Sequence, residues 1–172
     1  METEKIRTPE KIVFKKVSPD DWEKFRDIRL KGLQTDPQAF GGTFESESAE
    51  DESYWKDRFS NPERCFYAAE EGNAYIATAG SKKIAEDNWM IMAVYTLLEF
   101  RGKNISQELI NRVIDEAKNS GAKKVSLMVN LQQEAAINLY KKMGFEIIKI
   151  EKEQKMGDGK IYDEYYMEKS LN

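Results

Sequence analysis

The chain has 172 residues, enough for one domain with a proper core, and a net charge of only −4. Its basic residues are scattered, so the sequence does not predict nucleic acid as a partner. The absence of histidine excludes Ser-His and Cys-His triads, histidine metal sites and the commonest general base. Cys65 is the only cysteine, which also excludes an internal disulfide and a thiolate metal cluster, so we expect no metal.

The sequence carries few signals for compartment or membrane. No apolar run approaches the roughly 20 residues that a membrane span needs, so we expect no membrane association. A single cysteine and the lack of a signal-peptide pattern favour a cytoplasmic protein. Residues 1–10 are polar and are interpreted as a flexible N-terminal tail, with residues 11–172 as a single domain.

The first half of the chain predicts a strand, two helices and two more strands. The β-branched and aromatic content indicates the strands, and Ser18-Pro19-Asp20-Asp21 is typical of a capped helix start. The expected elements are a strand over 11–17, a helix from residue 19, a helix over 48–59, and strands over 65–69 and 74–80.

The second half predicts a buried strand followed by alternating helices and strands. Residues 89–96 form a nearly unbroken apolar run, as expected of a central strand buried on both faces. The remaining elements are a helix from Ile105 to about residue 119, a strand over 124–129, a short helix ended by Gly144, and strands over 145–153 and 161–167. This order predicts a three-layer α/β fold with a mixed sheet covered on both faces.

A basic turn, Arg101-Gly102-Lys103-Asn104-Ile105-Ser106, separates the buried strand from the next helix. A pyrophosphate needs several converging N–H donors, some positive charge and no bulky side chains, and a turn at a helix start supplies these. Asn104 is of the non-glycine type that best tolerates a left-handed backbone. The alternative interpretation is a strand-to-helix turn whose Arg101 and Lys103 are merely solvated.

This turn and a second motif, Leu139-Tyr140-Lys141-Lys142-Met143-Gly144-Phe145, together resemble the acyl-CoA half of the GNAT superfamily of N-acyltransferases. The resemblance implies an α/β/α fold with a mixed, mostly antiparallel sheet splayed between its fourth and fifth strands. It also implies acetyl transfer from acetyl-CoA to an amine, on a small molecule or a protein, with a homodimer left open. The chain departs from the family pattern at three positions. Asn104 and Ser106 stand where the family has Gly or Ala, and Leu98 stands where proline is typical.

The resemblance assigns cofactor-binding roles to two segments. Val94, Tyr95 and Thr96 would bind the pantetheine arm through main-chain atoms, and residues 101–106 would bind the pyrophosphate. Gln133 stands where the family often has a cofactor-contacting Asn. The alternative for Gln133 is a capping pair with Asn130 at a helix start.

By the same resemblance, Tyr140 protonates the leaving thiolate. The alternative is a plain core tyrosine on an inner helix face. Met90 and Met128 fall where GNAT enzymes carry a glutamate, and neither can accept a proton.

Glu45 and Glu47, in a loop that lines the acceptor pocket in the family, are therefore candidate acceptor-site residues, against the alternative of a solvated acidic loop. These acids and the acidic net charge favour a cationic amine. A rival from another class is a catalytically weak acyl-CoA-binding module that regulates a partner.

Overall fold

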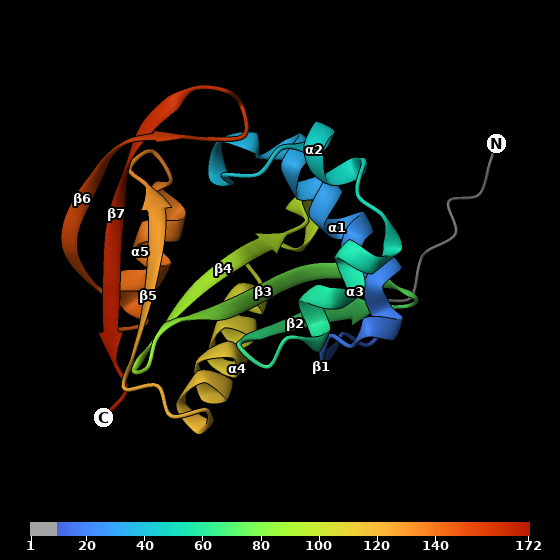
Figure 1. The fold of residues 1–172 in the computed structure, drawn as a ribbon, viewed down its shortest axis with the longest axis horizontal. Helices are drawn as coiled ribbons and strands as arrows, with labels where there is room; N and C mark the ends of the chain where they lie inside the picture. Colours follow the sequence, from blue (N-terminus) through green and yellow to red (C-terminus); the bar gives the residue numbers. More distant parts are fainter. Residues whose placement is uncertain (1–9) are drawn as a thin grey trace.

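The fold is built on a seven-stranded mixed sheet with the order β1-β2-β3-β4-β5-β7-β6 (Figure 1). The computed structural model describes residues 10–172, so the expected tail lies outside the described residues except for Glu10. The strands are β1 (Val13–Lys16), β2 (Arg64–Glu71), β3 (Ala74–Ala85), β4 (Asn88–Thr96), β5 (Lys124–Asn130), β6 (Glu146–Lys155) and β7 (Ile161–Ser170).

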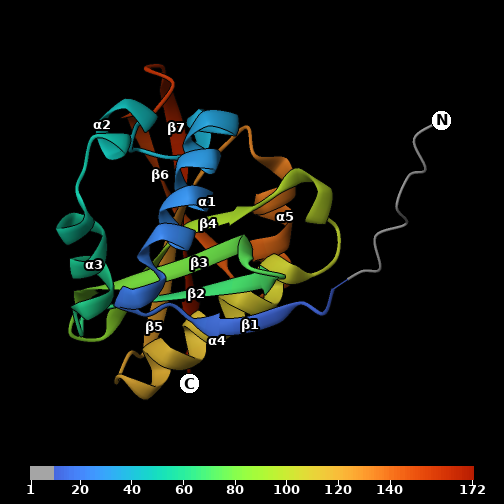
Figure 2. The same ribbon diagram turned by 90° about the vertical axis from the view of Figure 1, so that its right-hand side faces the viewer.

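Helices cover both faces of this sheet (Figure 2). One face carries α1 (Trp22–Thr35), α2 (Phe44–Ser48) and α3 (Glu52–Ser60), and the other carries α4 (Ile105–Asn119) and α5 (Glu134–Lys142). Each face buries its own hydrophobic cluster against the sheet, which confirms the expected three-layer α/β fold. No helix within residues 10–172 is long and apolar enough to cross a membrane.

The central strands β4 and β5 are parallel and pair only where they begin. The register joins Asn88, Trp89 and Met90 to residues 124–126. Beyond Met90, β4 pairs with β3 alone and β5 pairs with β7 alone, and the two strands diverge in Figure 1. The splay expected from the resemblance is therefore present, and it leaves one edge of β4 without a neighbouring strand.

A β-bulge interrupts β4 inside the splay. Its register with β3 skips from Met92–Gly80 to Tyr95–Thr78, and Ala93 between them has a φ of 54°. A left-handed non-glycine residue costs about 1–3 kcal/mol, and bulges redirect the strand that carries them. Here the Thr78 hydroxyl donates to the Ala93 carbonyl at 2.9 Å and holds the bulge. The middle of β4 is half-buried, not buried on both faces as predicted, because the splay removes its neighbour.

Two sequence predictions for the first half of the chain were wrong in their bounds. The helix expected over 48–59 begins only at Glu52, because the Asp51 side chain caps it by accepting from the backbone N–H of Tyr54. A further short helix, α2, lies in the segment expected as a loop, where the Thr43 side chain accepts from the backbone N–H of Ser46. The strands β2 and β3 also run beyond the predicted 65–69 and 74–80. Their extra residues pair with each other, which sequence propensity alone did not indicate.

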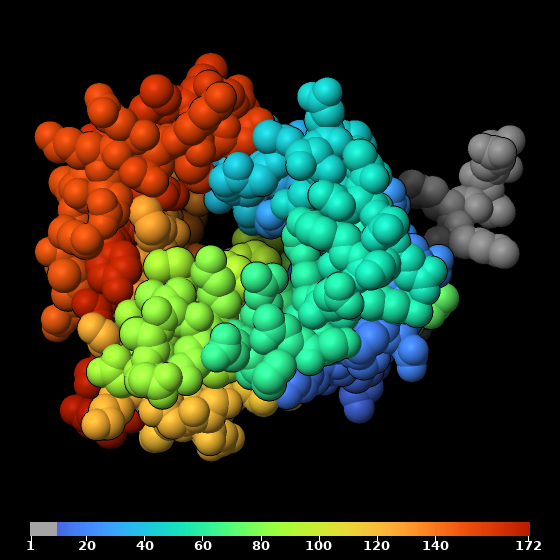
Figure 3. Space-filling model, viewed as in Figure 1, coloured from blue at the N-terminus to red at the C-terminus, as the bar shows by residue number. Residues whose placement is uncertain are grey.

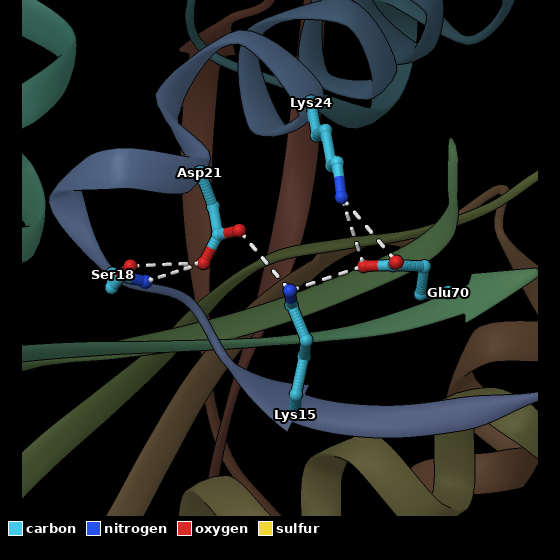
Figure 4. A network of polar contacts seen from close by, with 5 residues as sticks. All are labelled: Lys15, Ser18, Asp21, Lys24 and Glu70. Carbon is cyan, nitrogen blue, oxygen red and sulfur yellow. Dashed lines mark hydrogen bonds and ion pairs between the residues drawn. The ribbon is translucent and has the colours of Figure 1, made fainter. Parts of the chain in front are cut away.

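A polar network fixes the start of α1 against β1 and β2 (Figure 4). The Lys15 ammonium lies 3.1 Å from both Asp21 Oδ1 and Glu70 Oε2, and Lys24 lies 3.3 Å from Glu70 Oε1. Asp21 also accepts from the backbone and side chain of Ser18, in the reciprocal arrangement of a capping box. The capping box begins a 3-10 turn, Pro19–Asp21, that leads directly into α1, and the network ties this turn and α1 to β1 and β2.

A buried carboxylate joins the three helices of the same face. Glu47 of α2 is 6% exposed and accepts from Arg29 of α1 through Nη2 at 2.7 Å and Nε at 3.0 Å. Arg58 of α3 lies 3.7 Å from Glu47 Oε2, the oxygen that also accepts from Arg29 Nε. Removing one partner of a buried ion pair leaves an uncompensated charge, so Glu47 is important for the packing of these helices.

We expect Glu47→Gln to lower the free energy of unfolding by about 3 kcal/mol, because two arginines then lose their shared anion. The matched control is Glu45→Gln on the same helix, which is exposed and should change stability by less than about 0.5 kcal/mol. Urea denaturation of both variants measures the difference. Equal stability of the two variants would contradict the role given to Glu47.

The turn between β6 and β7 packs against the loop that follows α1. The Gly157 N–H donates to the Phe40 carbonyl at 2.7 Å. A Cβ atom on Gly157 would lie 2.3 Å from the Gly42 carbonyl oxygen and 3.0 Å from that of Pro37. These are backbone atoms that cannot move aside singly, so only glycine allows this contact.

We therefore expect Gly157→Ala to separate the turn from the loop and to cost about 2 kcal/mol of stability. Gly41→Ala is the control within the same loop, because nothing lies within 4 Å of the added methyl group. Thermal unfolding of the two variants distinguishes them. A Gly157→Ala protein that melts with the wild type would show that the turn and loop are not in firm contact.

Candidate active site

Two adjoining cavities occupy the splay, one of about 360 Å³ and one of about 750 Å³. We call them the smaller and the larger cavity. Figure 3 shows the surface hollowed where the cyan loop before α2, the yellow-green strand region and the orange C-terminal part meet. Both cavities are lined by Ala39, Phe40, Val94, Gln133 and Tyr140. They therefore meet at the bulge of β4 and the start of α5.

The larger cavity extends from the splay toward the turn before α4. In this turn Gly102 has a φ of 76° and Asn104 a φ of 61°, so Asn104 adopts the left-handed backbone predicted for it. Asn104 precedes the first residue of α4, and its side chain makes no capping hydrogen bond. The first N–H groups of a 15-residue helix thus have no side-chain acceptor at this end, which suits an anion.

The polar side chains of this turn differ in how firmly other protein groups hold them. Arg101 donates through Nε to the Thr96 carbonyl at 2.9 Å and through Nη2 to Asp36 at 2.6 Å. Ser106 Oγ lies 2.8 Å from Thr96 Oγ1 in a hydrogen bond. Lys103 is exposed, with its ammonium 5.2 Å from the Phe100 ring centre. Arg101 is therefore held by hydrogen bonds to Thr96 and Asp36, whereas the Lys103 ammonium is more available to a ligand.

Strand β4 contributes to the site mainly through its backbone. The Tyr95 side chain points toward α1, where its hydroxyl lies 2.7 Å from that of Thr35. A Cβ atom added to Gly32 of α1 would lie 3.1 Å from Tyr95 Cγ, so the Tyr95 ring packs closely against that glycine. Tyr95 lines the larger cavity, and Val94 lines both cavities. The stretch of β4 from Val94 to Thr96, whose edge has no β5 partner, therefore borders the larger cavity.

Gln133 stands at the start of α5 and lines both cavities. Its side chain makes no capping hydrogen bond, and its backbone N–H donates to the Asn130 carbonyl at 2.9 Å. The side-chain oxygen of Asn130 instead accepts from Gln132 N. The predicted alternative, a side-chain capping pair between Gln133 and Asn130, is therefore wrong, and the Gln133 amide is available to a ligand.

Tyr140 lies on α5 where the two cavities meet. It is 7% exposed, and its ring packs edge-on against Phe145 with centres 5.9 Å apart. Within residues 10–172 its hydroxyl has no hydrogen-bond partner. Burial raises the pKa of Tyr140 to about 12, so the hydroxyl keeps its proton at neutral pH. The Tyr140 ring is therefore packed in the core, and the same residue also lines both cavities.

The smaller cavity has apolar walls and cationic side chains. Met90 and Met128, the positions of the absent glutamates, both line it. Its charged lining residues are Arg29, Arg58, Arg64 and Lys82. Neither Glu45 nor Glu47 lines either cavity: Glu45 is exposed, and Glu47 is held by Arg29 and Arg58.

Sequence reasoning missed all four of these cations. Arg64 and Lys82 fell just outside the predicted strands, so their alternation with inward residues was not considered. In the structure Arg64 is two residues before the buried Phe66, which lines the same cavity. Alternation from a confidently predicted apolar residue is thus the signal that could have found Arg64.

Cys65 points to the opposite face and is not part of either cavity. Its thiol lies 3.3 Å from the Ser81 hydroxyl and is 4% exposed. Burial raises the pKa of the Cys65 thiol, which keeps it protonated and unreactive. The site therefore holds no cysteine nucleophile.

Comparison with known proteins agrees with this architecture. Residues 22–145 match the acetyltransferase (GNAT) family. An uncharacterized N-acetyltransferase of Methanocaldococcus jannaschii is 35% identical over 72 residues, which are 42% of this chain and 30% of that protein. N-acetyltransferase 8 of Rattus norvegicus is 28% identical over 99 residues, which are 55% of this chain and 43% of that protein. This chain thus spans less than half of the curated relatives it matches.

Solved structures share the fold at low identity. The GNAT-family acetyltransferase of Streptococcus pneumoniae superposes with a TM-score of 0.78 at 16% identity, over 94% of this chain and 100% of that one. Arabidopsis thaliana NAA60 in complex with acetyl-CoA gives a TM-score of 0.74 at 19% identity, over 94% and 99% of the two chains. The chain has the splayed sheet and the left-handed turn before α4, and the family match covers most of its length. This chain therefore belongs to the GNAT acetyltransferase family.

Proposed function

We propose that this protein is an N-acetyltransferase that moves the acetyl group of acetyl-CoA to an amine acceptor. The observation that carries the proposal is the splay itself: it places an unpaired strand edge, a helix N-terminus and a partnerless tyrosine hydroxyl around one pair of cavities. The larger cavity would take acetyl-CoA and the smaller one the acceptor. Tyr140, where they meet, would lie at the reacting atoms.

The residues of the larger cavity fit acetyl-CoA. Its pyrophosphate would accept from the free N–H groups at the start of α4, with Lys103 adding positive charge. Its pantetheine amides would pair with the unpaired β4 edge at residues 94–96, as an added strand does. Arg101 would act by positioning, because its bonds to Thr96 and Asp36 fix the turn relative to β4. Gln133 offers an amide donor and acceptor beside both ligands.

In the proposed reaction the amine nitrogen bonds to the thioester carbonyl carbon, and the carbon–sulfur bond breaks. Holding the two reactants in adjoining cavities supplies most of the acceleration. Tyr140 would donate its hydroxyl proton to the departing sulfur and regain one from the nitrogen through water. The products are the acetylated amine and the free thiol of CoA. A direct attack agrees with a site that holds neither histidine nor a reactive cysteine.

Replacing Tyr140 by Phe removes the proton donor and keeps the packing against Phe145. We expect Tyr140→Phe to lower kcat about 100-fold, with little change in the dissociation constant of acetyl-CoA. Steady-state kinetics and calorimetric titration measure the two quantities. Lys142→Ala on the same helix, at an exposed residue that lines neither cavity, is the control for general damage to α5. Parallel loss of turnover and binding in Tyr140→Phe would make the tyrosine structural.

The pH dependence follows from the absence of an enzyme base. No histidine exists in the chain, and among the residues that the structure describes no carboxylate lines the smaller cavity. We therefore expect kcat/KM to rise about tenfold per pH unit from pH 6 toward the pKa of the amine, as the neutral amine increases. Because the pKa of Tyr140 is about 12, the acid stays protonated and no activity is lost up to pH 10. A plateau beginning near pH 7 with an amine of pKa near 10 would reveal a base in the enzyme.

A further inference from the structure

We propose that the acceptor is an amine that carries an anionic group, a carboxylate or a phosphate, several bonds from its nitrogen. The inference rests on the proposed function and names the acceptor class of the same site. It departs from the cationic amine favoured by the sequence, because the carboxylates on which that expectation depended do not line the cavity. The cations that do line it were not considered there.

The charge of the smaller cavity is one-sided. Arg29, Arg58, Arg64 and Lys82 line it, and no carboxylate within residues 10–172 does. Glu47 lies behind Arg29 and Arg58 and offsets part of their charge. The net acidity of the whole chain is therefore reversed within this cavity. Such a cavity attracts an anion and repels a diamine or polyamine.

Arg64 and Lys82 are the strongest sign of a missing anion. They are opposite each other in the antiparallel register of β2 and β3, an arrangement in which like charges destabilise a sheet. Within residues 10–172, neither side chain has a hydrogen-bond or ion-pair partner. Arg64 is exposed and Lys82 half-buried, so water hydrates both charges, and a bound anion would neutralise this like-charge pair through charge-assisted hydrogen bonds.

The register also indicates how far this anion lies from the reacting nitrogen. Lys82 is opposite Met90 in β4, whereas Val94 borders the junction of the two cavities. Val94 is four positions after Met90, but the bulge at Ala93 sets three steps of β4 opposite two of β3, so the distance corresponds to three steps of β3, or about 10 Å at the usual rise per residue. The side chains of Arg64 and Lys82 cover part of this distance. The spacing therefore fits an amine and an anion joined by a chain of about five or six atoms.

The walls between these two ends suit an apolar spacer. Met90, Met92 and Met128 line the smaller cavity together with Phe66. Methionine side chains adapt to irregular apolar shapes and leave no polar group without a partner. A methylene chain can thus lie along the methionines, with its amine at Tyr140 and its anion at Lys82.

The experiment compares acceptors that differ only at the far end of one chain. 6-Aminohexanoate and 6-aminohexyl phosphate carry the anion, hexylamine is neutral there, and 1,6-diaminohexane is cationic. We expect kcat/KM with acetyl-CoA to be at least tenfold higher for an anionic acceptor than for hexylamine, with the diamine lowest. The ratio between the carboxylate and the phosphate identifies which anion the cavity prefers. Equal values for all four, or a preference for the diamine, would overturn the proposal.

Variants locate the effect in the smaller cavity. The double variant Arg64→Gln, Lys82→Gln should reduce the preference for 6-aminohexanoate over hexylamine at least tenfold. It should melt no lower than the wild type, because the change removes a like-charge pair. The matched control is Lys83→Gln: Lys83 is the next residue of β3, pairs with Glu86 and does not line the cavity. An undiminished preference in the double variant would contradict the assignment.

A binding measurement separates this proposal from the proposed function. 6-Acetamidohexanoate, the expected product, and the neutral N-hexylacetamide are titrated calorimetrically into protein with excess CoA. Tighter binding of the anionic compound, lost in the double variant, would support the anion site even if no amine were turned over. Turnover of amines without any anionic preference would leave the acetyltransferase and overturn the anion site. Absence of both turnover and selective binding would overturn both.

Discussion

The site depends on one interruption of a hydrogen-bonded ladder: β4 stops pairing with β5 after Met90. A sheet normally satisfies both edges of a central strand, and here one edge of β4 is left free within the molecule. The bulge at Ala93 sits in this free stretch, where its strained backbone is held by Thr78 from the neighbouring strand. Because the strands diverge, helix α5 can bring Tyr140 to the gap from one face while α1 closes it from the other.

The two faces of the sheet contribute different chemistry to this gap. The face of α4 and α5 supplies a helix N-terminus and a protonated tyrosine, neither of which is a charged side chain. The face of α1 to α3 supplies arginines, two of them positioned by a single buried carboxylate. Glu47 therefore holds Arg29 and Arg58 in place, and both arginines line the smaller cavity. The charge of the cavity is opposite to that of the whole chain because the acids lie outside its lining.

Local sequence predicted the elements well and the site only in part. The left-handed turn at Asn104 followed from residue type, and the apolar run of β4 from composition. The splay came from family resemblance alone, since no local pattern shows where two strands stop pairing. The sequence did not predict that Arg64 and Lys82 form a pair. Charged residues at strand ends have the composition of loop residues, and only the register of β2 with β3 places these two together.

We propose that the unpaired β4 edge and the turn before α4 hold acetyl-CoA. Amide hydrogen exchange, followed with and without saturating acetyl-CoA, is the measurement suited to this proposal because it reports on the backbone N–H groups themselves. We expect slower exchange in residues 94–96 and 101–106, with the outer strands β1 and β6 unchanged. Unaltered exchange in both segments at millimolar acetyl-CoA, or protection confined to other parts of the chain, would contradict it.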